Sequence, residues 1–193
     1  MLLSDVYALS IDETCQEPSE ILPNLFLCGI AAIKPELLER LDVRMVLNLC
    51  NEVKRPSRQV ISGVLHCHIP TDDSKNYPLC QHFDECNALL DTHWSPLKGS
   101  PAVIVHCLAG ASRSPTVLIA FLMWKYAVGV EQAHSVVATR RGQRVHPNEG
   151  FMQQLRQYEE NGFKVVHNTS SSVWWWCWLV VVASVVAVLL IRR

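Results

Sequence analysis

The centre of the predicted fold is one continuous run, residues 102–124, which read AVIVHCLAGASRSPTVLIAFLMW. It opens with a short apolar run, 102–106, of the kind that forms a strand buried on both faces. A loop of mostly small residues follows, and from Pro115 to Tyr126 the chain is then apolar on every side, as in a helix at the centre of a domain. Proline fits the first turn of a helix because no N–H donor is needed there. We therefore expect a buried strand, a tight loop and a buried helix in succession.

Similar patterns surround this stretch. Short apolar runs predict strands at 25–28, 44–49 and 64–69, the last of them stopped by Pro70. Apolar residues at helical spacing predict helices at 35–41 and 79–93, and two further stripes consist of Val130, Ala133 and Val137 and of Phe151, Leu155 and Tyr158. Strands that alternate with helices predict an α/β fold, in which helices flank both faces of a central, mostly parallel sheet.

Length and composition define the class of protein. The 193 residues suffice for one ordinary domain, and a chain that is 49% hydrophobic and 18% charged is not intrinsically disordered. The net charge of −1 excludes a nucleic-acid binder held by bulk charge, so we expect no nucleic-acid partner. We divide the chain into a lead-in at 1–18, a folded domain at 19–162, a tether at 163–172 and a transmembrane helix at 173–191.

The transmembrane prediction rests on residues 173–191, VWWWCWLVVVASVVAVLLI, which carry no charge. As a helix this run is about 28 Å long, enough to cross the hydrocarbon core of a bilayer. Tryptophans gather at one end and Arg192 and Arg193 follow the other, as is typical of membrane interfaces. With no signal peptide at the start, the run predicts a single-pass tail anchor with residues 1–172 in the cytosol.

Two features bear on that orientation. The terminal arginines argue weakly for the opposite one, and Asn168-Thr169-Ser170 is a glycosylation sequon that matters only on the lumenal side. The eight cysteines, however, are scattered without a CxxC pair, which is typical of a reduced set rather than of a disulfide framework or a zinc site. The cysteines favour the cytosol.

The loop after the central strand carries the chemistry. A strand, a loop of small residues and a helix start gather backbone N–H groups around an oxyanion, here the amides of Leu108, Ala109, Gly110, Ala111 and Ser112. Such a ring favours the thiolate of Cys107, which becomes a nucleophile toward phosphorus. Arg113 supplies a fork for two phosphoryl oxygens. We expect His106 to orient the loop and tune the thiol, and Ser114 to donate to the sulfur so that it leaves more easily.

This motif, HCxAGxSRS at residues 106–114, resembles the signature of the cysteine-dependent protein tyrosine phosphatases, most closely the small, atypical dual-specificity phosphatases. The resemblance runs from about Pro18 to Glu160. It includes residues 22–29 at the front and Arg140-Arg141 and 147–151 at the back. It implies hydrolysis of phosphoproteins through a phosphocysteine intermediate, with neither cofactor nor metal.

The resemblance also implies a general acid on an upstream loop. Residues 69–73, IPTDD, follow the third predicted strand, and the register of similar phosphatases selects Asp73, 34 residues before Cys107, with Asp72 as the alternative. In the matching segment at the back, Asn148 is expected to support the phosphate loop by a hydrogen bond.

Three other groups are candidates for roles near the site. His66 and His68 flank Cys67, but in a strand the histidines share one face and the cysteine points to the other, which disfavours a metal site. Cys50 lies just past the second strand and is a candidate for a protective disulfide with oxidised Cys107. Arg140, Arg141 and Arg144 form either a basic rim for a second phosphate or the membrane, or a plain solvated face.

The substrate class follows in part from the loop. Residues 108–112 contain no lysine to meet the extra phosphates of an inositol lipid. About 140 residues leave little room for the long loops that deepen a pocket for phosphotyrosine alone. We therefore expect a shallow site that accepts phosphotyrosine and phosphoserine/threonine. The alternatives are a lipid-phosphate phosphatase at the membrane surface and a phosphoprotein-binding adaptor with little turnover.

Overall fold

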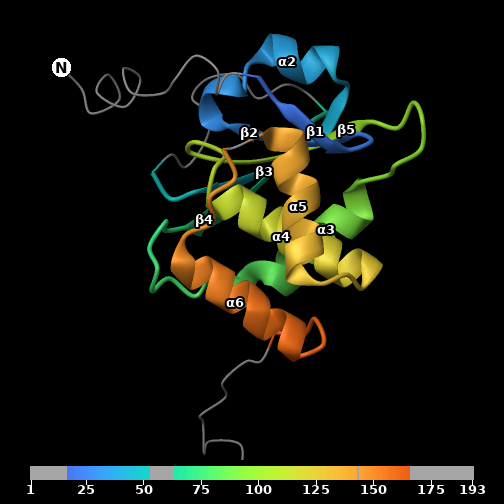
Figure 1. The fold of residues 1–193 in the computed structure, drawn as a ribbon. Helices are drawn as coiled ribbons and strands as arrows, with labels where there is room; N and C mark the ends of the chain where they lie inside the picture. Colours follow the sequence, from blue (N-terminus) through green and yellow to red (C-terminus); the bar gives the residue numbers. More distant parts are fainter. Residues whose placement is uncertain (1–16, 53–62, 143, 166–193) are drawn as a thin grey trace, which may run out of the picture.

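The computed structural model describes residues 17–52, 63–142 and 144–165 (Figure 1). Five strands, two short 3-10 helices and five α-helices alternate along them. They are β1 Ser19–Leu22, β2 Leu25–Gly29, η2 Ile30–Ala32, α2 Pro35–Arg40, β3 Val43–Cys50, β4 Leu65–Thr71, η3 Leu79–His82, α3 Phe83–His93, β5 Ala102–Cys107, α4 Arg113–Tyr126, α5 Val130–Arg141 and α6 Glu149–Glu160.

The strands form one sheet in the order β1-β2-β5-β3-β4. Four of them run parallel, and β1 pairs with β2 antiparallel, so the mostly parallel sheet expected from the sequence is confirmed. The strand β1 was missed, because four residues of mixed polarity carry no clear alternation. A two-residue turn joins it to β2, and Asn24 in that turn adopts a positive φ of 64°. Asn24 is tied down by its side chain, which donates to the carbonyls of Ser95 and Leu97.

The strand β4 is longer than the sequence suggests. Pro70 was expected to stop it, yet it continues to Thr71. Because β4 is an edge strand of the described sheet, one side of its backbone needs no partner, and a residue without an N–H is tolerated there.

Helices cover both faces of the sheet, as predicted. The helix α2 packs on one face, in a cluster that includes Leu38, Val46 and Ile104. The helices α3 to α6 cover the other face (Figure 1), where Leu47 and Val105 belong to the same core cluster as residues of α4. Eleven consecutive residues of α4, from Arg113 to Met123, are buried, which explains why its sequence is apolar on every side.

The site lies where the parallel strands end. The strands β2, β3, β4 and β5 all deliver their carboxyl ends to one edge of the sheet, and the chain enters α4 from the last of them. Ligands of open α/β sheets bind at this edge. The helix α4 begins at Arg113, so Pro115 lies in its first turn, as expected.

Within these described ranges, no helix has the length and apolar character needed to cross a membrane. The run at 173–191, most of the tether and residues 1–16 lie outside them.

Candidate active site

Cys107 ends β5 at the bottom of the loop, and its side chain is 1% exposed. The Gly110 N–H and the Ser114 hydroxyl donate to its Sγ over 3.3 and 3.1 Å. Gly110 has a φ of 69°, and a Cβ at this position would lie 2.4 Å from the carbonyl oxygen of Cys28. Only glycine fits this part of the loop, because both the backbone conformation and the space exclude a side chain.

The rest of the loop is held from outside. The carbonyl of Leu108 accepts from the Ile30 N–H at 3.0 Å, and the carbonyl of Ala111 accepts from the His146 N–H at 2.8 Å. A trans peptide points its C=O and the next N–H in opposite directions. With these two carbonyls bound to flanking segments, the N–H groups that follow them face away from those segments, as an oxyanion cradle requires.

Arg113 is 2% exposed, and its guanidinium donates three hydrogen bonds. Its Nη1 and Nη2 donate to the two carboxylate oxygens of Glu52 at 2.8 and 2.9 Å, and Nη1 also donates to the Thr71 carbonyl at 2.9 Å. Burial opposes the charge of Glu52, but its hydrogen bonds with Arg113 and with nearby backbone outweigh burial and lower its pKa. Both partners are therefore ionised at neutral pH.

Glu52 is a site residue that sequence reasoning missed, since it stands in a polar stretch assigned to a loop. The sequence nevertheless contains a feature that could have identified it. Like Asp73, Glu52 is an acidic residue that follows a predicted buried strand, at the edge of the sheet where the strands end.

The structure separates the two aspartates after β4. Asp73 faces the loop: its Oδ1 accepts from the Ser112 hydroxyl at 2.7 Å, and its Oδ2 lies 3.7 Å from Nε of Arg113. Asp72 points elsewhere, and its Oδ1 accepts from the Asn51 side chain at 2.6 Å in an exposed position. The geometry thus favours Asp73 over Asp72 as the acid that reaches the site.

His106 is buried one residue before the cysteine. Its Nδ1 lies 3.3 Å from the Cys107 carbonyl oxygen, and its buried Nε2 has no hydrogen-bond partner among the described residues. Burial lowers the pKa of His106 to about 4. The imidazole is therefore neutral at physiological pH and brings no positive charge to the thiol.

The structure contradicts part of the basic rim. Arg141 is buried, and its Nη1 donates to the Glu17 carbonyl and to the Ser19 hydroxyl, so it fastens the start of β1 to α5. Sequence spacing did not reveal this, because the contact between α5 and β1 joins segments that lie far apart in the chain. Arg140 is exposed and Arg144 half-buried.

The remaining candidates, His68 and Cys50, contact the backbone or the hydrophobic core. His68 Nε2 lies 2.7 Å from the Cys50 carbonyl oxygen, and no cluster of metal-ligating side chains occurs in the part of the chain that the structure describes. Cys50 is buried in the same core cluster as Cys107. Burial, with a smaller contribution from Cys107, raises the pKa of Cys50 to about 12, so Cys50 is a thiol at neutral pH. Its disulfide with Cys107 stays a prediction.

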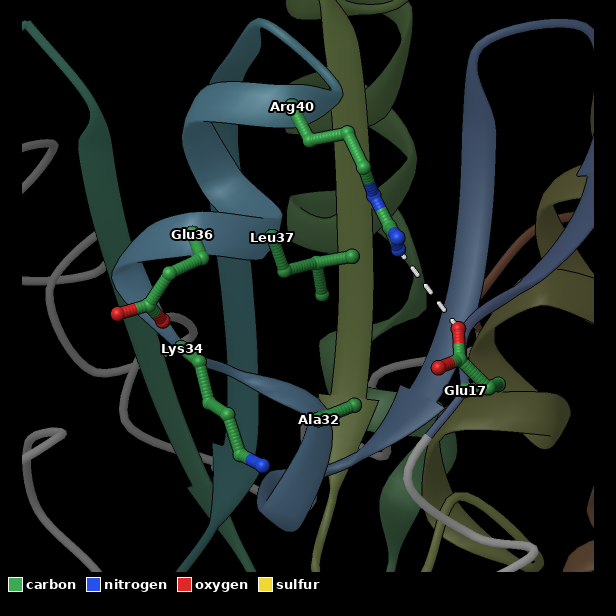
Figure 2. Close-up of a pocket in the computed structure, with 6 residues that line it drawn as sticks. All are labelled: Glu17, Ala32, Lys34, Glu36, Leu37 and Arg40. Carbon is green, nitrogen blue, oxygen red and sulfur yellow. Dashed lines mark ion pairs between the residues drawn. The ribbon is translucent and has the colours of Figure 1, made fainter.

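Two surface pockets lie away from this loop. One, of about 210 Å³, is bordered by α2 and crossed by the Glu17–Arg40 ion pair, with Lys34 and Glu36 at its wall (Figure 2). The other, of about 370 Å³, includes Cys80 of η3 and Gln154 of α6 in its lining. Neither is lined by a residue of 106–114.

Comparison with known proteins agrees with this geometry. A family model described as "Dual specificity phosphatase, catalytic domain" matches residues 25–161. Human dual specificity protein phosphatase 5 is 38% identical over 143 residues, which cover 74% of this chain and 35% of that protein. The Arabidopsis thaliana dual specificity protein phosphatase 1B is 32% identical over 144 residues, 74% of this chain and 82% of that protein.

Solved structures give the same result. Human DUSP28 superposes with a TM-score of 0.65 at 28% identity, covering 75% of this chain and 93% of that one. A human tyrosine phosphatase-like serine/threonine/tyrosine-interacting protein superposes with a TM-score of 0.65 at 25% identity, covering 77% and 99%. The chain spans well under half the length of several curated relatives, for example 42% of mouse dual specificity protein phosphatase 12.

Proposed function

The chain belongs to the family of dual-specificity phosphatase catalytic domains, and on this premise we propose that it hydrolyses phosphotyrosine and phosphoserine/threonine on proteins, with Cys107 as nucleophile. The observation that carries the proposal is the state of Arg113. Of its five N–H groups, Glu52 and Thr71 occupy three. The Nε–H is buried and has no hydrogen-bond partner among the described residues, and one N–H of Nη2 remains beside it. These two neighbouring donors form a fork for two phosphoryl oxygens.

In the first step the Cys107 thiolate attacks phosphorus and the bond to the leaving oxygen breaks. The loop amides and the free edge of Arg113 hold the three equatorial oxygens, whose charge develops in a fixed, water-poor site. Asp73, in its protonated form, gives its proton to the departing alkoxide or phenoxide. The products of this step are the alcohol and a phosphocysteine.

In the second step water displaces the sulfur. Asp73, now ionised, accepts a proton from the attacking water, and inorganic phosphate leaves. The Ser114 hydroxyl, 3.1 Å from Sγ, stabilises the thiolate as it forms. Each residue thus returns to its starting state.

Protein substrates are favoured over lipids by the loop itself. The side chains at 108–112 are uncharged, so they offer no cation to the additional phosphates of an inositol lipid. The names of the curated relatives, which are dual specificity protein phosphatases, support the same class.

The test is turnover of phosphotyrosine and phosphothreonine peptides by the wild type, Cys107→Ser and Cys80→Ser, the last a cysteine in the wall of a distant pocket. We expect Cys107→Ser alone to abolish turnover while it still binds the peptides. Undiminished turnover by Cys107→Ser overturns the nucleophile assignment. Binding without turnover by the wild type indicates an adaptor. Preferential release of phosphate from phosphoinositide vesicles indicates a lipid phosphatase.

We further propose that residues 173–191 anchor the chain in a membrane with the catalytic domain in the cytosol. The uncharged run and its flanking tryptophans and arginines support insertion. Free thiols at Cys28, Cys50, Cys67, Cys80, Cys86 and Cys107 are compatible with a reducing compartment. Extraction of the full chain by detergent but not by alkaline carbonate is expected, and a glycan on Asn168 would contradict the cytosolic orientation.

A further inference from the structure

The loop that carries Asp73 is fastened to the beginning of α6. The Lys75 side chain meets Glu149 at 2.6 Å, and the Gln154 side chain donates to the Tyr77 carbonyl at 2.9 Å. Between these contacts the backbones nearly touch: a Cβ on Gly150 would lie 1.9 Å from the Lys75 carbonyl oxygen. The position of the acid loop therefore depends on α6, a helix that contributes no residue to the phosphate loop.

Asn148 makes the contact that reaches the acid itself. Its side-chain Oδ1 caps α6 by accepting from the Phe151 N–H at 3.0 Å. Its Nδ2 donates to Oδ1 of Asp73 at 3.0 Å. Because the carbonyl end of the amide is committed to the helix, only the N–H end can face the aspartate.

The two oxygens of Asp73 are thereby made unequal. Oδ1 accepts from both Ser112 and Asn148, whereas Oδ2 lies beside Nε of Arg113 at 3.7 Å. An oxygen that already accepts two hydrogen bonds has little capacity to carry a proton as well. Oδ2 is left for the proton, next to the guanidinium that binds the phosphoryl group.

We propose that the side chain of Asn148 is a positioning group for the general acid: by holding Oδ1 of Asp73, it directs Oδ2 and its proton toward the leaving oxygen. This role rests on the proposed phosphatase function. It differs from support of the phosphate loop, which Asn148 gives through its backbone, since its N–H donates to the Ser112 hydroxyl at 3.3 Å. Side-chain substitutions leave that N–H in place.

The chain offers a matched pair of variants. Asn148→Asp is isosteric and keeps a good helix cap, but it replaces the donor to Asp73 by a carboxylate. Asn148→Ala removes both the cap and the donor. We expect Asn148→Asp to keep the cap but to lose some stability through repulsion between its carboxylate and that of Asp73, and Asn148→Ala to lose the stability that the cap contributes, as denaturant unfolding measures.

The loss of activity should depend on the lost hydrogen-bond donor to Asp73 and not on the lost helix cap. For aryl phosphates with poor leaving groups, both variants should lose kcat by roughly tenfold to a hundredfold, as expected for one hydrogen bond to a charged group, with KM nearly unchanged. For good leaving groups, which need little proton transfer, the loss should be small. In an Asp73→Asn background, neither variant should lower kcat further.

The outcomes are distinct. The positioning role is wrong if Asn148→Asp keeps full activity on poor leaving groups. It is also wrong if the loss of kcat in Asn148→Asp is independent of the leaving group, or if it adds to the loss of kcat in Asp73→Asn. If Asp73→Asn itself shows no dependence on the leaving group, the acid assignment fails, and if Cys107→Ser keeps turnover, the proposed phosphatase mechanism fails.

Discussion

Glu52 and Arg113 form a two-pronged ion pair whose N–O distances are 2.8 and 2.9 Å, although 61 residues separate them in the chain. The pair occupies one edge of the guanidinium; at the other edge, Nε has no hydrogen-bond partner among the described residues, and Asp73 Oδ2 lies 3.7 Å from it. A planar fork held at one edge can present the other with little loss of side-chain entropy on binding. We regard Glu52 as the residue that orients Arg113.

Replacing Glu52 with Gln tests this orientation. The carboxamide keeps the shape but has one acceptor oxygen and no charge, so the guanidinium loses one of its two hydrogen bonds to this side chain and also its counterion. We expect weaker binding of vanadate or phosphate, a roughly tenfold or larger loss of kcat/KM, and about 2 kcal/mol lower stability. Glu36→Gln, on the exposed side of α2, is the control. Unchanged vanadate affinity in Glu52→Gln would show that Arg113 is oriented by other contacts.

Removing the Ser114 hydroxyl should slow the second chemical step selectively. Sγ then lacks one of its two hydrogen-bond donors when it must leave as a thiolate. We expect Ser114→Ala to show a burst of aryl alcohol followed by turnover roughly ten- to a hundredfold slower than wild type, with phosphocysteine trapped by acid quench. Ser100→Ala, in the turn before β5, should behave as wild type. Slow turnover without a burst would place the effect on the first step.

Gly110→Ala should disrupt the loop. The new Cβ would meet the Cys28 carbonyl oxygen at 2.4 Å in a backbone conformation that already disfavours side chains. Gly99→Ala is a matched control, because Gly99 also has a positive φ, 81°, but nothing lies within 4 Å of the added atom. We expect about 1 kcal/mol of destabilisation for the control, and a larger loss together with lost vanadate binding for Gly110→Ala. Equal effects would mean that the close approach to Cys28 is unimportant.

His106 should make stability depend on pH. Its pKa is about 4 in the folded protein, mainly because of burial, against an ordinary value near 6.5. Between these values the unfolded chain binds the proton and the folded protein does not, so stability is full above pH 6.5 and falls as the pH drops toward 4. The expected loss from pH 7.5 to pH 5 is about 2 kcal/mol. Urea unfolding of wild type and His106→Gln measures it, and equal pH slopes would contradict the assignment.

Much of this molecule was predictable from local patterns. The run at 102–106 and the apolar helix that begins near Pro115 identified β5 and α4, because a segment buried on all sides must be apolar throughout. The motif at 106–114 placed sulfur, amides and guanidinium together, since the five residues 108–112 between the strand and the helix can form only a compact loop. Where burial was incomplete, as in β1 and at Pro70, the local pattern was weaker and the predicted elements were missing or too short.

The chemistry available to this protein can be read from its sequence: a cysteine and an arginine with five mostly small residues between them, and two aspartates upstream. Which of these groups lie together depends on the tertiary structure. It places Asp73, and not Asp72, beside Ser112 and Arg113, brings Glu52 to Arg113, buries Arg141, and sets the Asn148 side chain against Asp73. These pairs are separated by tens of residues, and what joins them is the packing of strand ends and helix starts at one edge of the sheet, which periodicity along the chain does not encode.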